Sequence, residues 1–135
     1  KHPDKTVVTD KLALALSSWR EGRWLEAEAQ CREILSIQAE NPDAMHLLGI
    51  VLNDGGRFGD ALVYLDQVLK KFPDSAVAHY NRGNSLSGLK SYQDALGCYD
   101  HAIRLRKGYT DALNNRGIIF LQLMQIQKSQ FLVLL

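Results

Sequence analysis

The stretch that decides the fold is Gly56-Arg57-Phe58-Gly59-Asp60-Ala61. Related stretches lie at equal distances before and after it, over residues 22–27 and 90–95. All three end in an alanine and carry an aromatic residue at the third position: Ala27, Ala61 and Ala95, with Trp24, Phe58 and Tyr92. The residue numbers in both series increase by 34 each time. A fixed period of this length indicates a repeat protein, in which each unit buries its apolar face against its neighbours.

The same period holds for a series of small residues: Ala15, Gly49, Gly83 and Gly117. We therefore predict a lead-in over residues 1–7 and a single domain over residues 8–135. Its repeats span 8–41, 42–75, 76–109 and 110–135, and the last repeat is incomplete, because its pattern is lost after about Gln125. The 135 residues allow one domain of ordinary size.

Each repeat is predicted to form two helices. In the second repeat, two apolar series at helical spacing flank the break Asp54-Gly55-Gly56. Asn41 and Ser75 are suited to cap the first helices of two successive repeats, and Gly108 is suited to end a helix. The small residues allow the paired helices to approach closely, and the aromatic residue is expected to fill the elbow between them.

This pattern resembles the tetratricopeptide repeat family. The resemblance rests on the aromatic elbow, the alanine of the second helix, Pro73 at a repeat end, and three pairs of residues: Leu48-Gly49, Arg82-Gly83 and Arg116-Gly117. It implies an all-α fold, a right-handed superhelical stack of antiparallel helix pairs with three full repeats and a partial fourth. It also implies a concave groove lined by the first helix of each repeat.

The groove positions that the resemblance implies carry two kinds of residue. Apolar side chains dominate the N-terminal half, and amides dominate the C-terminal half. An amide donates and accepts hydrogen bonds, so it suits an extended peptide backbone. The candidate groove residues are Leu12, Leu16, Trp19, His46, Leu47, Ile50, Asn53, Tyr80, Asn81, Asn84, Asn114, Asn115 and Ile118.

Two of these amides, Asn81 and Asn115, lie one repeat apart. They are similar to rungs of the asparagine ladder in the repeat domain of O-linked N-acetylglucosamine transferases, which grips a peptide main chain. The alternative is that they are solvated or bond between helices. Similarly, Leu16 and Trp19 either bind a ligand or pack against an upstream helix.

A carboxylate clamp of the kind found in co-chaperones with three such repeats is not predicted. That clamp needs lysine, asparagine and arginine at set groove positions. Here those positions hold Leu12, Leu16, Leu47, Val77 and Asn81, and the register one repeat later supplies no cation either.

Catalytic, metal and cofactor sites are not predicted. No nucleotide-binding or hydrolase motif occurs, and His46, His79 and His101 are not expected to converge. Cys31 and Cys98 lie almost two repeat lengths apart, which favours two reduced, buried thiols over a long-range disulfide. Arg82 and Arg116 replace a usual leucine, and Asp100 is a candidate partner for Arg82.

The predicted function is protein–protein interaction, with an extended peptide or a helix of a partner bound in the groove. The alternatives are a non-catalytic recognition arm of a larger enzyme, such as a glycosyltransferase, and a self-assembling scaffold that forms a homo-oligomer through the incomplete C-terminal repeat. The formal net charge of +1 gives no reason to expect nucleic acid or a membrane as a partner. The chain begins without Met, which indicates an excised piece. Its compartment is open, with the cytoplasm favoured.

Overall fold

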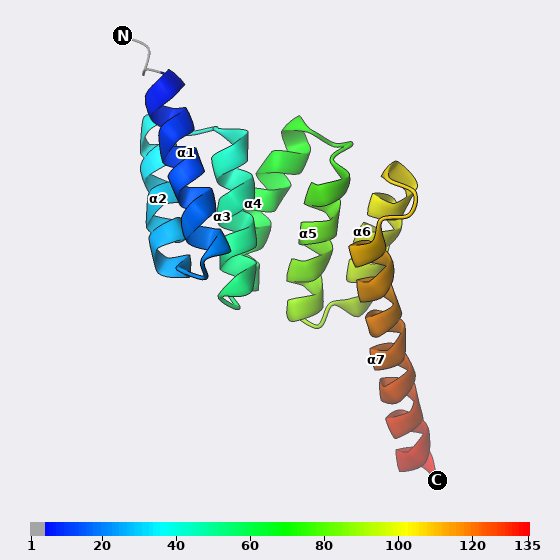
Figure 1. Ribbon diagram of the computed structural model, residues 1–135. Coiled ribbons are helices and arrows are strands. Elements are labelled where there is room, and N and C mark those ends of the chain that lie inside the picture. The colour runs from blue at the N-terminus through cyan, green and yellow to red at the C-terminus, as the bar shows by residue number, and fades with distance from the viewer. Residues whose placement is uncertain (1–4) are drawn as a thin grey trace. The chain divides into compact units, whose positions relative to one another are not determined.

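The computed structural model describes residues 5–135 and contains seven α-helices and no strand in that range. Residues 1–4 of the predicted lead-in lie outside the described part, and the first helix begins at Lys5. The helices are α1 (Lys5–Arg20), α2 (Trp24–Ile37), α3 (Pro42–Asp54), α4 (Phe58–Lys71), α5 (Ala76–Gly88), α6 (Tyr92–Leu105) and α7 (Thr110–Leu134) (Figure 1).

The helices form two compact units. Unit 1 contains the described residues up to Pro73, with α1 to α4, and unit 2 contains Asp74–Leu135, with α5 to α7. In unit 1, α1 packs on α2, α2 on α3, and α3 on α4, and in unit 2, α6 packs on both α5 and α7. The single domain predicted over residues 8–135 stays a prediction.

Side-chain caps begin two of the helices. The Asn41 side chain accepts a hydrogen bond from the Ala44 amide at 2.9 Å, and Pro42 is the first residue of α3. Ser75 caps α5 in the same way through the amide of Ala78, at 3.2 Å. Both predicted caps are therefore confirmed, and each satisfies one of the amides that a helix start leaves unpaired.

The turns inside the helix pairs repeat one backbone geometry. Gly22 and Gly56 each have φ of +76°, and Lys90, one repeat later, has φ of +63°. A side chain in this left-handed region costs about 1 kcal/mol or more, so the turn between α5 and α6 is strained where the other two are not.

Apart from Gly117, the small residues of the repeat series lie where helices meet, as predicted. Ala15, Ala27, Ala61 and Ala95 are all fully buried. A Cβ atom added to Gly49 would come within 2.8 Å of the Leu65 side chain. The backbones of α3 and α4 therefore approach each other at a point where only glycine fits.

One expectation about the elbows is wrong. Trp24 is the first residue of α2, and 45% of its surface is exposed. It therefore does not fill the elbow of the first helix pair. Phe58 and Tyr92, at the same position in later repeats, are half-buried.

Candidate functional site

The main candidate site is a hollow of about 210 Å³ between α1 and α3, which we call the unit 1 hollow. Its lining consists of apolar side chains with one histidine and one carboxylate: Leu12, Leu16, Trp19, Asp43, His46, Leu47 and Ile50. All of these except Asp43 belong to the groove set predicted from the sequence. The structure therefore brings the predicted apolar half of the groove together within one unit.

Helical spacing explains why these side chains meet. Leu12, Leu16 and Trp19 are four and three residues apart and share one face of α1. Leu47 and Ile50 share the facing side of α3 in the same way. Leu47 is buried and belongs to the hydrophobic core of unit 1, against which the three α1 residues pack. The floor of the hollow is thus part of the core, which holds it in shape.

The ring of Trp19 is fixed at one end of the hollow by a hydrogen bond. Its Nε1 donates to Oδ2 of Asp54 at 2.7 Å. A bond to a carboxylate is stronger than one between neutral groups. Asp54 is the last residue of α3, so this bond ties the C-terminal ends of α1 and α3 together and orients the indole.

His46 is the one titratable ring in the lining. Burial lowers the pKa of His46 below its ordinary value of about 6.5, although the nearby Asp43 carboxylate acts in the opposite direction. The neutral imidazole is therefore favoured at neutral pH, and the hollow is predominantly apolar under these conditions.

This shift makes the stability of unit 1 depend on pH. The unfolded chain binds a proton to His46 at higher pH than the folded chain does, so folded stability is fully present above about pH 6.5 and falls as the pH falls. We expect His46→Gln to reduce the loss of unfolding free energy between pH 7.5 and pH 5. Urea unfolding monitored by Trp19 and Trp24, both in unit 1, measures this difference.

A matched control is His101→Gln, since burial and the nearby His79 and Arg104 also lower the pKa of His101, which lies in unit 2. Equal pH dependence of the wild type and His46→Gln would contradict the assignment to His46. Partial burial raises the pKa of Glu28, but hydrogen bonds from Arg32 and Arg57 outweigh this effect and lower that pKa overall. Glu28 therefore titrates only in stronger acid, and the range from pH 7.5 to pH 5 avoids its contribution to stability.

Two of the predicted groove amides join two tyrosines in a hydrogen-bond network inside unit 2, which we call the amide network: Tyr80, Asn84, Tyr99 and Asn115. The Tyr99 hydroxyl donates to Oδ1 of Asn84 at 2.7 Å. Nδ2 of Asn115 donates to the same oxygen at 2.9 Å and to the Tyr80 hydroxyl at 3.2 Å. The network links all three helices of unit 2. For Asn115, the alternative of a bond between helices describes these contacts.

The remaining predicted residues are spread over different environments. Asn81 is buried, with 7% of its surface exposed. Asn53 is half-buried, and Asn114 and Ile118 are exposed. The sequence interpretation missed Tyr99, although a signal was present: a tyrosine stands on α6 where the previous repeat has the buried Leu65.

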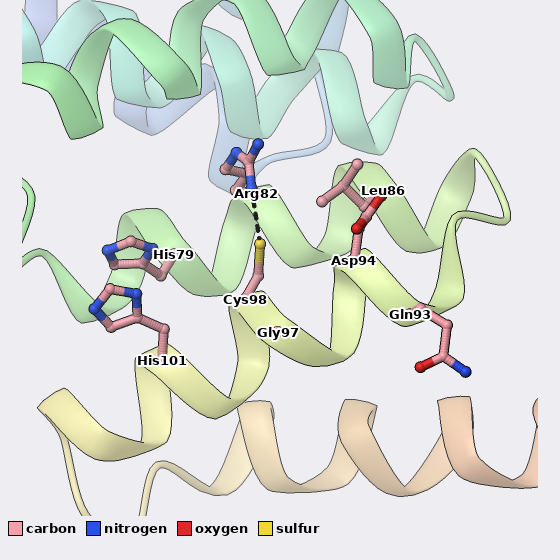
Figure 2. A pocket seen from close by; sticks show the side chains of 8 residues that line it. All are labelled: His79, Arg82, Leu86, Gln93, Asp94, Gly97, Cys98 and His101. Atoms are coloured by element: carbon pink, nitrogen blue, oxygen red, sulfur yellow. Dashed lines mark hydrogen bonds between the residues drawn. The ribbon is translucent and has the colours of Figure 1, made fainter.

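A second hollow, of about 420 Å³, lies between α5 and α6 (Figure 2). Its lining is His79, Arg82, Leu86, Gln93, Asp94, Gly97, Cys98 and His101. The rings of His79 and His101 stack with their centroids 3.9 Å apart, so two of the three histidines meet here, whereas His46 lies in unit 1. Helices α5 and α6 are antiparallel, and Gly83 faces Tyr99. His79, shortly before Gly83, therefore meets His101, shortly after Tyr99.

The two arginines at leucine positions, Arg82 and Arg116, bond to different groups. Asp100 accepts a hydrogen bond from Arg116 at 2.9 Å, whereas the guanidinium of Arg82 donates to the sulfur of Cys98 at 3.1 Å, as Figure 2 shows. Cys98 and Cys31 are both buried and free of any disulfide. Burial raises the pKa of Cys31 to about 12, so this thiol stays protonated at neutral pH.

Residues 5–135 contain no cluster of three or more histidine, cysteine or acidic side chains that could hold a metal ion. No helix in this range is both long enough and apolar enough to cross a membrane.

A tetratricopeptide repeat family model matches residues 18–81. Over this range the chain carries tetratricopeptide repeats. The predicted fold class, an all-α array of tetratricopeptide-like helix pairs, is confirmed by solved structures of the same fold. A comparison with curated protein sequences finds no significant match.

Among solved tetratricopeptide repeat structures, an O-GlcNAc transferase mutant from Thermobaculum terrenum is similar at 28% identity, with a TM-score of 0.84 over 88% of this chain. The chain spans 23% of the length of that transferase. The first tetratricopeptide domain of Spaghetti (RPAP3), bound to the HSP90 peptide SRMEEVD, has 16% identity and a TM-score of 0.83, covering 91% of this chain and 98% of that one.

A third tetratricopeptide protein, YrrB, is described as having an unusual peptide-binding site. It shares 20% identity and a TM-score of 0.74, covering 79% of this chain and 55% of that one. At these identities the last two structures support the fold alone.

Proposed function

We propose that the chain is a protein-interaction module whose unit 1 hollow receives an apolar side chain from an extended peptide or a helix of a partner. The observation that carries this proposal is the hollow itself, an apolar depression held between two helices. Tetratricopeptide neighbours that bind peptides support it at the level of the family.

The size of the hollow favours an anchor side chain over a whole small molecule. Small-molecule sites occupy about 300–1,000 Å³, and the unit 1 hollow has about 210 Å³. A cavity of about 150 Å³ is enough for a benzene ring. One aromatic or branched aliphatic side chain therefore fits, and the rest of the partner would lie along the surface.

The chemistry of the hollow argues against the acidic kind of peptide that the RPAP3 domain binds. Three of the last four residues of the HSP90 peptide in that complex are acidic. Here Leu12, Leu16 and Leu47 stand at positions where a carboxylate clamp would need polar or cationic side chains, and all three line the hollow. We expect an apolar anchor in place of a terminal carboxylate pair.

A displayed library of random peptides, selected on the wild-type chain, tests this proposal. We expect the selected peptides to share an aromatic or aliphatic residue, and Ile50→Ala or Leu16→Ala to weaken their binding at least about 10-fold, as loss of an anchor contact does. The matched control is Val63→Ala, because Val63 is an exposed apolar residue of unit 1 outside the hollow. Undiminished binding to both hollow variants would contradict the proposal.

The asparagine ladder remains a separate part of the proposal. In the amide network, both N–H groups of Asn115 already donate to Tyr80 and Asn84, so a peptide would have to compete with these bonds. The double variant Asn81→Ala with Asn115→Ala distinguishes peptide binding by the asparagine ladder from peptide binding in the unit 1 hollow. Unchanged peptide binding would remove the ladder and leave the hollow as the site.

A second candidate function is the recognition arm of a glycosyltransferase. The observation that favours it is the 28% identity to the Thermobaculum terrenum O-GlcNAc transferase. The coding sequence that follows Leu135 tests it: a glycosyltransferase domain there would support the role, and a stop codon or an unrelated domain would contradict it.

A further inference from the structure

One exposed feature of unit 2 is a stripe along α7, which we call the α7 stripe: Gly117, Leu121, Met124, Lys128, Phe131 and Leu135. Its members alternate four and three residues apart, the spacing of a coiled-coil seam. The four apolar side chains are between 60% and 87% exposed. Figure 1 shows the later half of α7, in orange and red, extending beyond the rest of unit 2.

Over the first half of α7, the face opposite the stripe already packs within unit 2. Ala112 and Ile119 are buried, and α7 packs on α6 within unit 2. Ile119 is two residues from Gly117, which places it about 200° away around the helix axis. The α7 stripe therefore faces away from α6.

Glycine at position 117 indicates what the stripe is built to meet. Its counterparts are Gly49, whose added Cβ would lie 2.8 Å from the Leu65 side chain, and Gly83, whose added Cβ would lie 2.6 Å from the Tyr99 ring. At both glycines, a large side chain of the facing helix packs directly against the backbone. At Gly117 the added Cβ would meet nothing within 4 Å.

We propose that the α7 stripe pairs with the α7 stripe of a second copy of this chain, with the two helices antiparallel. In this register Gly117 meets Leu135 of the second copy, Leu121 meets its Phe131, and Met124 meets its Lys128. The positions in each pair add up to the same number, so every contact occurs twice about one twofold axis, as a closed dimer requires.

The stripe also selects the direction of the partner helix. A parallel pair would place Lys128 against Lys128 and Gly117 against Gly117, which sets like charges together and leaves a void. The antiparallel pair matches each glycine with Leu135. It also lays the aliphatic stem of each lysine along Met124, with the ammonium free to reach water.

The chain's own C-terminal residues cannot cover Gly117 in this structure. α7 is continuous to Leu134, so Leu135 lies about 27 Å farther along the helix axis than Gly117. Electrostatic repulsion between the two copies is limited to one pair of side chains, since Lys128 is the only charged side chain in residues 117–135.

Sedimentation equilibrium of the 135-residue chain tests the proposal. We expect a monomer–dimer equilibrium in the micromolar range and at least a 10-fold weaker dimer for Leu121→Glu. The matched control, Gln122→Glu, adds the same charge one residue away from the stripe and should dimerise like the wild type. A wild type that stays monomeric at several hundred micromolar, or a Leu121→Glu variant that dimerises undiminished, would overturn the proposal.

Disulfide formation between cysteine variants tests the direction. We expect Gly117→Cys mixed with Leu135→Cys to form a cross-linked dimer faster than either variant alone. The added Cβ at position 117 has open space around it, so this variant should fold. Faster cross-linking of Gly117→Cys with itself would overturn the antiparallel arrangement, and the wild type, with both cysteines buried, supplies the background rate.

Discussion

Replacing Tyr99 by alanine is expected to lower the free energy of unfolding of unit 2 by about 3–5 kcal/mol, the range for removing a fully buried aromatic ring. Only 1% of the Tyr99 surface is exposed, and its ring lies directly against the backbone at Gly83. Since glycine has no side chain to move into the space, the cavity should persist. Urea unfolding by circular dichroism, with amide exchange of α5 and α6 as a local readout, measures the loss.

The matched control is Tyr99→Phe, which keeps the ring and removes only the hydroxyl. Asn84 would lose the donor at 2.7 Å but keep the donor from Asn115. We therefore expect a cost of about 0.5–1.5 kcal/mol, the net worth of one hydrogen bond. Equal effects of the alanine and phenylalanine variants would mean that the ring does not stabilise unit 2 by its packing.

In unit 1, Leu65→Ala is expected to cost about 2–5 kcal/mol, because Leu65 is fully buried against Gly49. Gly49→Ala alone should also destabilise, since its Cβ would lie 2.8 Å from Cγ of Leu65. This overpacking, of about 1–3 kcal/mol, opposes the gain in helix propensity of about 1 kcal/mol. Tryptophan emission during urea unfolding reports both effects.

Combining the two substitutions should recover stability. The methyl group of alanine at position 49 would occupy part of the space that Leu65 vacates, so the double variant should be more stable than the sum of the single effects by about 1–3 kcal/mol. Additivity within about 0.5 kcal/mol would show that the glycine and the leucine are not coupled.

The fold followed from the sequence because the repeat period and the helical spacing give the same answer. The period placed the caps at Asn41 and Ser75 and the close approach at Gly49, and all three are confirmed. These features depend on short-range geometry and on one facing helix, and both recur from repeat to repeat.

The candidate site followed less completely, because its details depend on which side chains meet across helices. The apolar residues of the unit 1 hollow were predictable from the groove positions that the family resemblance implies. The bond from Trp19 to Asp54 and the convergence of Tyr99 and Asn115 on Asn84 were not, since a register gives the face of a residue but not its hydrogen-bond partner. The exposed Trp24 shows the same limit for packing.

The two side-chain caps have a consequence for how such a chain can change its length. Asn41 and Ser75 stand one repeat length apart and start α3 and α5 by the same bond to an amide three residues on. If the segment between these two residues were duplicated, each copy would begin with a capping residue and would be followed by another capping residue. The gene could therefore be lengthened or shortened by whole modules without inventing a new local structure, and the α3–α4 hairpin is a ready cassette for grafting.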